Sequence, residues 1–309
     1  MKKLLSFSLA LIIALSCCML SFAADNSNPF ENSEYFTYGD YTLHYRVFEP
    51  QTEAKNQIIL IHGFGLSGVS FEGVCSEYVR NGYRVVLADM PNFGYSSRET
   101  ATTNLIDRET LTYMLMKSIN NSSWIVGGHS MGGGIAMNIA TDHPEAVSGL
   151  VLFAPQTSTE VKTPMDKILR SAPIRGAFDI IIRLGARVDL VMKMMVEMSF
   201  SDGNFAENYD LSKISDPLKI PGTGAGMAVM ASHARGTDYE KLSALSVPTI
   251  IVTSANDKVA NAKNLEKTIQ NAPEGTVLYE FEEGGHMMME YAPEEAAQVT
   301  LPVMNNCSC

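Results

Sequence analysis

Hydrophobic and polar positions alternate along residues 41–48, as in a strand with one buried face. Further along, four short runs are apolar throughout and predict fully buried strands: 57–61, 83–88, 124–126 and 147–153. Helical spacing of apolar positions lies between these runs, in 71–80, 105–119 and 131–141. Short apolar strands that alternate with helices indicate a parallel sheet covered by helices on both faces.

This alternation of predicted strands and helices stops after the run 147–153. Residues 156–245 contain helical stretches and loops but no convincing strand. The pattern then resumes with predicted strands at 249–252 and 277–281, and with predicted helices at 262–270 and from Pro293 onward. We therefore predict an α/β core formed by residues 24–155 and 246–309, interrupted by a helical insert at 156–245.

The first residues have the features of an export signal. Two lysines open the chain, the run Leu4–Leu20 is nearly all apolar, and the small residues Ser21 and Ala23 follow it. The run is just short of the ~20 residues that a membrane-spanning helix needs. We expect residues 1–23 to be removed and the protein to be periplasmic or extracellular. Retention of the segment as a membrane anchor is the alternative.

The five cysteines fall into three groups. Cys17 and Cys18 lie in the predicted signal, and lipidation of either one would anchor the protein, although the residues before them depart from the usual lipoprotein pattern. Cys75 lies in a predicted helix and is expected to be buried. Cys307 and Cys309 lie in a polar tail where the sequence does not decide their pairing.

The charge of the chain narrows its range of partners. A formal net charge of −11, spread along the sequence, argues against nucleic acid and anionic membrane surfaces as partners. No set of His, Cys and carboxylate residues has the spacing of metal ligands, so we predict no metal. Neither a dinucleotide-binding glycine pattern nor a P-loop is present, so we predict no cofactor.

A candidate nucleophile lies between a predicted strand and a predicted helix. Ser130 is at the centre of Gly128-His129-Ser130-Met131-Gly132. This strand–turn–helix setting is what a nucleophile elbow requires, because a tight turn presents the hydroxyl at the carboxyl edge of the sheet. The two glycines leave room where a Cβ atom would collide with neighbouring backbone.

A serine hydroxyl is a weak nucleophile and needs a base that a carboxylate orients. Asp257 follows the strand 249–252, and His286 follows the strand 277–281. Both residues therefore belong to the same edge of the sheet as Ser130, where open α/β sheets bind their ligands. The loop after the strand 147–153 offers no carboxylate, which favours Asp257 as the acid of the triad.

Acyl transfer also needs donors for the oxyanion, and backbone amides commonly supply them. We expect the amide of Met131, directly after the nucleophile, and the amide of Phe64, in the loop His62-Gly63-Phe64-Gly65, to fill this role. Gly63 in the same loop is expected to border the substrate. His129 is also assigned to the substrate site, packing beneath the turn.

On these motifs, and on the segment 89–96, the chain resembles the α/β-hydrolase superfamily. The resemblance extends from Tyr41 to about Pro293 apart from the insert, and it implies a lid after the sixth strand, which matches the insert 156–245. One departure is Asn92, where the family usually has glycine. Asparagine tolerates a left-handed backbone better than most residues, so the exchange is compatible with the turn.

The insert is rich in methionine and supplies the remaining candidate residues. Met192 and Met195 lie in a strongly apolar stretch and are predicted to line an adaptable pocket for acyl groups, the alternative being a helix packed on the core. His233 is a further candidate for contact with substrate.

The combined hypothesis is a serine hydrolase, like a carboxylesterase or a lipase, that cleaves a small-molecule carboxylic ester through an acyl-enzyme. A carbon–carbon bond hydrolase, a thioesterase and an acyltransferase share the same residues, and a catalytically silent binding protein on the same fold is a separate alternative.

Overall fold

The computed structural model describes residues 28–157, 168, 171–231 and 235–308. The predicted signal 1–23, with Cys17 and Cys18, lies outside these residues, as do His233 and Cys309. A compact unit extends from Asn32 to Cys309.

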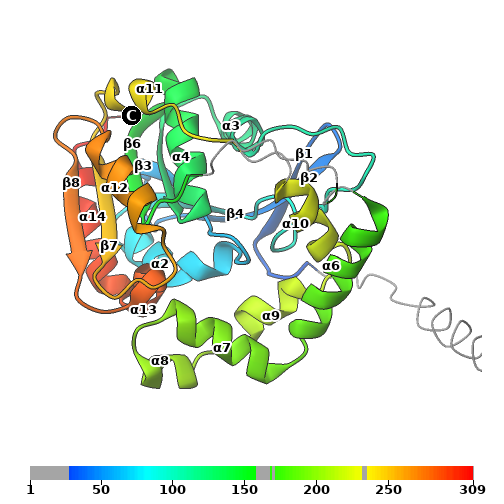
Figure 1. The fold of residues 1–309 in the computed structure, drawn as a ribbon. Coiled ribbons are helices and arrows are strands. Elements are labelled where there is room, and N and C mark those ends of the chain that lie inside the picture. The colour runs from blue at the N-terminus through cyan, green and yellow to red at the C-terminus, as the bar shows by residue number, and fades with distance from the viewer. Residues whose placement is uncertain (1–27, 158–167, 169–170, 232–234, 309) are drawn as a thin grey trace, which may run out of the picture. The chain divides into compact units, whose positions relative to one another are not determined.

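One eight-stranded sheet forms the centre of this unit, in the order β1-β2-β4-β3-β5-β6-β7-β8 (Figure 1). The strands are β1 (Ser33–Tyr38), β2 (Tyr41–Phe48), β3 (Asn56–Ile61), β4 (Tyr83–Ala88), β5 (Trp124–His129), β6 (Val147–Phe153), β7 (Thr249–Ser254) and β8 (Val277–Phe281). Strand β2 pairs antiparallel with β1 and β4, and all pairs from β4 to β8 are parallel. The predicted α/β fold is therefore confirmed.

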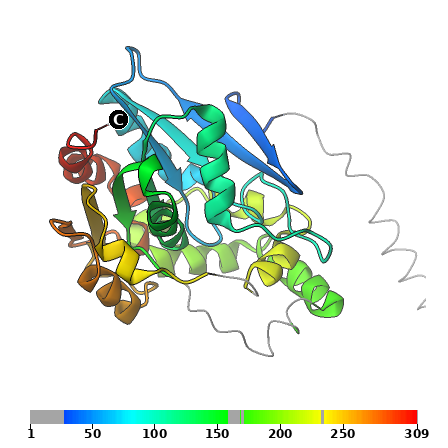
Figure 2. The same cartoon turned by 90° about the horizontal axis from the view of Figure 1, so that it is seen from above.

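Helices cover both faces of the sheet, as the continuous apolar strands require. Helices α3 (Arg108–Ile119) and α4 (Met131–Asp142) pack together, and α2 (Glu72–Arg80) packs with α14 (Pro293–Met304) (Figures 1 and 2). Helix α12 (Ala262–Gln270) connects β7 to β8, and α13 (Met288–Tyr291) precedes α14. None of the helices in the described ranges is long and apolar enough to cross a membrane.

The insert between β6 and β7 is helical, and its described residues form no strand. Its helices are α6 (Ala172–Gly185), α7 (Asp189–Ser199), α8 (Gly203–Glu207), α9 (Ser212–Leu218), α10 (Thr223–Ala231) and α11 (Tyr239–Ser243). The helical character of 156–245 thus agrees with the sequence pattern in the described part, whereas the role of this insert as a lid stays a prediction.

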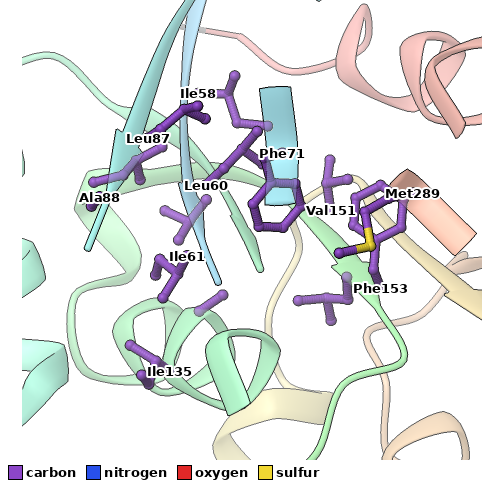
Figure 3. Packing of buried hydrophobic residues seen from close by; sticks show 14 of the residues in the cluster. Ile58, Leu60, Ile61, Phe71, Leu87, Ala88, Ile135, Val151, Phe153 and Met289 are labelled. Atoms are coloured by element: carbon purple, nitrogen blue, oxygen red, sulfur yellow. The ribbon is translucent and has the colours of Figure 1, made fainter. Parts of the chain in front are cut away.

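The core lies on both sides of the central strands. Figure 3 shows Ile58 and Leu60 of β3 packing near Phe71, while Val151 and Phe153 of β6 lie near Met289. Each of these side chains is almost completely removed from water, which contributes about 1.5–3 kcal/mol for a residue of this size. The central strands are thereby fixed in register, and their carboxyl ends form a rigid platform for loops.

Candidate active site

Ser130 lies at the turn between β5 and α4, in a backbone conformation that residues other than glycine rarely adopt. Its φ is 51° and its ψ is −117°. Backbone hydrogen bonds hold it there, because its amide donates to the Phe153 carbonyl at 2.9 Å and its carbonyl accepts from the Gln156 amide at 2.9 Å. Strained residues of this kind cost about 1–3 kcal/mol and cluster at functional sites.

Close backbone contact at this turn explains the flanking glycines. A Cβ atom on Gly128 would collide with the Gly132 carbonyl, and a Cβ atom on Gly132 would collide with the Ile61 carbonyl at the end of β3. Glycine is therefore the residue that lets the first turn of α4 pack directly against the sheet.

Asp257 and His286 form a buried hydrogen-bonded pair at the same edge of the sheet. His286 Nδ1 lies 2.7 Å from Asp257 Oδ2, and each side chain is only 7% exposed. The other carboxylate oxygen, Oδ1, accepts hydrogen bonds from the amides of Val259 at 2.8 Å and Ala260 at 2.9 Å. These bonds fix the carboxylate, and the carboxylate fixes the orientation of the imidazole.

The environment of Asp257 keeps it ionised. Burial on its own would raise the pKa of the carboxyl, but the His286 hydrogen bond and charge, together with the two amides, lower the pKa below its ordinary value of 3.8. An ionised carboxylate on Nδ1 leaves Nε2 of His286 as the nitrogen that can exchange a proton with a substrate.

His129 connects the nucleophile turn to the loop that carries His286. Its Nε2 lies 2.8 Å from the His286 carbonyl oxygen, so this nitrogen donates, and the two rings lie 4.5 Å apart between centroids. Burial, reinforced by the neighbouring His286, holds the pKa of His129 well below its usual range. His129 is thus a neutral side chain that packs under the turn.

The Ser130 hydroxyl makes no hydrogen bond to a residue in the described ranges, and catalytic hydrogen bonds are often loose without substrate.

The two predicted oxyanion donors lie beside Ser130. Phe64, Met131 and Ser130 line one cavity of about 280 Å³. Within the described residues, no backbone carbonyl accepts a hydrogen bond from the Phe64 or Met131 amide, so both donors remain available. His62 fixes the loop, since its Nδ1 donates to the Gly63 carbonyl at 2.7 Å and its Nε2 accepts from the Met90 amide at 3.0 Å.

Gly63 lies against both residues of the turn. A Cβ atom placed on Gly63 would come within 2.6 Å of His129 Nδ1 and 3.3 Å of Ser130 Cβ. A larger residue at this position would displace Ser130 or His129. Gly63 therefore determines how closely the loop 62–65 approaches Ser130.

The two methionines that the sequence assigns to the substrate pocket are not among the residues that line the cavity beside Ser130. Met192 is buried in the core cluster, Met195 is exposed, and neither lines the cavity beside Ser130. Their contact with substrate stays a prediction, and His233 lies outside the described residues. From the insert, the cavity is instead lined by Met230 of α10 together with Thr157 and Arg235.

Several cavity residues were not singled out by the sequence. Ile135 and Asn138 follow Met131 on one face of α4, and Glu109 of α3 accepts a hydrogen bond from Asn138 Nδ2 at 2.8 Å. The helical spacing of 131, 135 and 138 was the available signal, because residues three and four apart share a face. No His, Cys, Asp and Glu group in the described part of the chain could hold a metal ion.

Comparisons with known proteins agree with this fold. The family model described as the alpha/beta hydrolase fold matches residues 56–293. The uncharacterized hydrolase YugF of Bacillus subtilis (strain 168) is 23% identical over 263 residues, which cover 84% of this chain and 93% of that protein.

Solved structures share the fold. An enol-lactonase from Burkholderia xenovorans LB400 superimposes with a TM-score of 0.69 at 15% identity, covering 88% of this chain and 100% of the other. A thermophilic esterase from Thermogutta terrifontis gives a TM-score of 0.63 at 19% identity, covering 86% and 95%. With the family model matching most of the chain, this protein belongs to the α/β hydrolase fold family and is a hydrolase of that family.

Proposed function

We propose that the protein is a serine hydrolase that cleaves carboxylic esters through an acyl-enzyme intermediate. The observation that carries this proposal is the buried Asp257–His286 pair at 2.7 Å, at the sheet edge where the strained Ser130 turn also lies. A carboxylate-oriented imidazole at the same sheet edge as a half-buried serine is the arrangement from which a nucleophilic serine is built.

The proposed reaction has two halves. Ser130 Oγ attacks the ester carbonyl while His286 Nε2 removes the hydroxyl proton, and the same proton then goes to the leaving alcohol. Water, deprotonated by His286, hydrolyses the acyl-enzyme and restores Ser130. In both halves Asp257 stabilises the imidazolium, and the amides of Phe64 and Met131 donate to the oxyanion of the tetrahedral intermediate.

The cavity suits a small ester. Its volume of about 280 Å³ is at the lower end of ligand pockets. Phe64, Ile135 and Met230 provide apolar walls, whereas Asn138 and Arg235 add polar groups to the lining. The esterase and the enol-lactonase among the structural relatives support an ester or lactone as the substrate class.

The test is hydrolysis of p-nitrophenyl esters of increasing acyl length by wild type, Ser130→Ala and Ser243→Ala. Ser243 is an exposed serine on α11 and controls for the loss of a hydroxyl. We expect wild type and Ser243→Ala to turn over equally, with a preference for short acyl groups, and Ser130→Ala to fall by about 10⁶-fold in kcat.

Ester turnover that survives in Ser130→Ala would reject the serine mechanism. If no ester of any length reacts, a carbon–carbon bond hydrolase, a thioesterase, an acyltransferase or a non-catalytic binding protein would replace the ester hydrolase as the proposal. A fluorophosphonate probe separates these outcomes, since a binding protein without an activated serine would not react with it.

We also propose that residues 1–23 direct export and are then removed. The support is the apolar run Leu4–Leu20 and the small residues at its end. Mass spectrometry of the protein from its native host tests this, because a mature chain that begins at Ala24 is expected and a chain that retains Leu4–Leu20 would contradict it.

A further inference from the structure

Helix α6 carries its apolar residues on the outside. Ile181 and Leu184 are 64% and 58% exposed, whereas the polar residues Asp179 and Arg183 are turned toward the protein. Asp179 pairs with Arg183 at 3.4 Å and accepts a hydrogen bond from the Gly224 amide at 3.2 Å. A surface helix of a globular protein normally has the opposite orientation, with its apolar face toward the core.

The exposed apolar residues form a regular series, which we call the apolar stripe. Its members are Ile174, Phe178, Ile181, Leu184, Val188, Val191, Met195 and Met198, all exposed. Within α6 and within α7 they are three or four residues apart, which is the spacing of one helical face, and Val188 lies between the two helices. Ile180, Leu190 and Met194 beside them are exposed as well. The stripe runs from α6 into α7, which both lie at the periphery of the molecule (Figure 1). Exposed apolar surface of this extent marks an interaction site.

Two features of the stripe favour a lipid surface over a protein partner. Residues 171–200 contain four basic and three acidic side chains, in a chain whose net charge is −11. Arg187 and Lys193 in this segment are exposed, and long basic side chains can extend from an apolar surface to lipid headgroups. A stable protein interface, by contrast, needs about 20–30 residues on each side, more than the exposed apolar residues of α6 and α7 provide.

The stripe is also close to the proposed active site through one intervening helix. Helix α10 packs on α6 so tightly that a Cβ atom on Gly224 would lie 2.5 Å from the Phe178 carbonyl. The same helix α10 carries Met230, which lines the cavity beside Ser130. A surface that binds the stripe would therefore lie against the same insert that borders the cavity.

From these observations, we propose that α6 and α7 bind the surface of a phospholipid bilayer through the apolar stripe. The helices lie in the plane of the headgroups, with the stripe in contact with the acyl region and the basic side chains at the phosphates. This inference extends the proposed function, on which its consequence for catalysis rests. The natural ester is then a short-acyl ester that partitions into the bilayer, in keeping with the cavity of about 280 Å³.

The experiment is flotation of the mature chain, beginning at Ala24, with vesicles of phosphatidylcholine and phosphatidylglycerol. All strands and helices of the compact unit follow Asn32, so this chain keeps the whole core. The test variant is Ile181→Lys/Leu184→Lys. The matched control is Val277→Lys/Leu278→Lys, which makes the same kind of change at two exposed apolar residues of the edge strand β8.

We expect wild type and the β8 variant to float with the vesicles, and the stripe variant to lose at least about tenfold in partitioning, because two large apolar side chains no longer leave water. Equal flotation of the two variants, or no flotation of wild type, would overturn the proposal. If the stripe variant instead abolishes self-association in sedimentation and leaves flotation unchanged, the stripe binds a second copy and the proposal is wrong.

Hydrolysis of a short, soluble ester separates this inference from the proposed function. The stripe variant is expected to hydrolyse p-nitrophenyl acetate as well as wild type does, since the stripe residues do not line the cavity. If wild type floats but hydrolyses no ester, the lipid surface stands and the ester hydrolase fails. If wild type hydrolyses the ester in a Ser130-dependent way but does not float, only the lipid surface fails.

Discussion

Ser130 shows how much of a site a short motif can predict. The glycines on either side, the preceding strand and the following helix together predict a tight turn, and the structure has this turn with φ at 51°. Asn92 is a second residue of this kind, since its φ of 77° is the left-handed conformation that the replaced glycine would adopt. The Asp257–His286 hydrogen bond is also present. The roles of these residues stay predictions, which substitutions can test.

Asp257→Asn is expected to lower kcat for an ester by about 10³–10⁴-fold while the fold is retained. An amide at this position no longer stabilises the imidazolium and favours the wrong tautomer of His286. Asp210→Asn removes an exposed carboxylate that does not line the cavity, and it serves as the control. Equal rates for wild type and Asp257→Asn would show that Asp257 is not the acid of the triad.

The pKa of Asp257 also predicts a pH dependence of stability. Because this pKa is lower in the folded protein than its ordinary value of 3.8, the carboxylate stabilises the fold above that value, and the contribution is lost as pH falls through the folded pKa. We expect the difference in free energy of unfolding between wild type and Asp257→Asn to shrink as the solution is acidified toward about pH 3. Denaturant titrations across this range measure it, and a difference that grows on acidification would contradict the assignment.

At the scale of the element, α6 and α7 mark the limit of what periodicity can tell. The spacing of apolar residues predicts that a helix has an apolar face, but it carries no information on whether that face meets the core or the solvent. In α7, Met192 and Val196 point inward while Met194 and Met195 point outward. The sequence also missed β1, an edge strand whose residues are mostly exposed and therefore lack the apolar run that identified the inner strands.

Helix α7 has one buried and one exposed methionine whose substitutions we predict to differ in their effect on stability. Met192 is 3% exposed and Met194 is 55% exposed. Met192→Ala should lower the free energy of unfolding by about 2–4 kcal/mol through lost burial and a cavity. Met194→Ala should change it by less than about 0.5 kcal/mol.

Urea titration of both proteins provides the measurement. The same variants test the acyl-pocket prediction, because a change in the preference for acyl length in Met192→Ala, without one in Met194→Ala, would place Met192 near the substrate. Equal stability losses in the two variants would mean that the burial pattern of α7 is different in solution.

At the scale of the whole molecule, the class of fold is predicted better than the walls of the cavity. Alternating strands and helices gave the class of fold, and chain order gave the edge on which the site residues meet, because the carboxyl ends of parallel strands share one edge. The cavity walls could not be predicted in the same way. They combine Phe64, Glu109 and Arg235, from segments far apart in the chain, whose proximity depends on packing rather than on local pattern.

The dispersed origin of the site has a consequence for how the protein acquires activity. Ser130 follows β5, Asp257 follows β7, and His286 follows β8, one of the two edge strands of the described sheet. Strand β8 pairs with β7, and β7 pairs with β6 across the insert. Parallel pairings between distant segments form slowly, because loop closure must precede the contacts that repay it. During refolding from denaturant, fluorescence of Trp124 in the centre of the sheet should therefore recover before esterase activity does. A chain can then be folded at its core and still be inert, and catalysis becomes a readout of the joining of the strands that follow the insert.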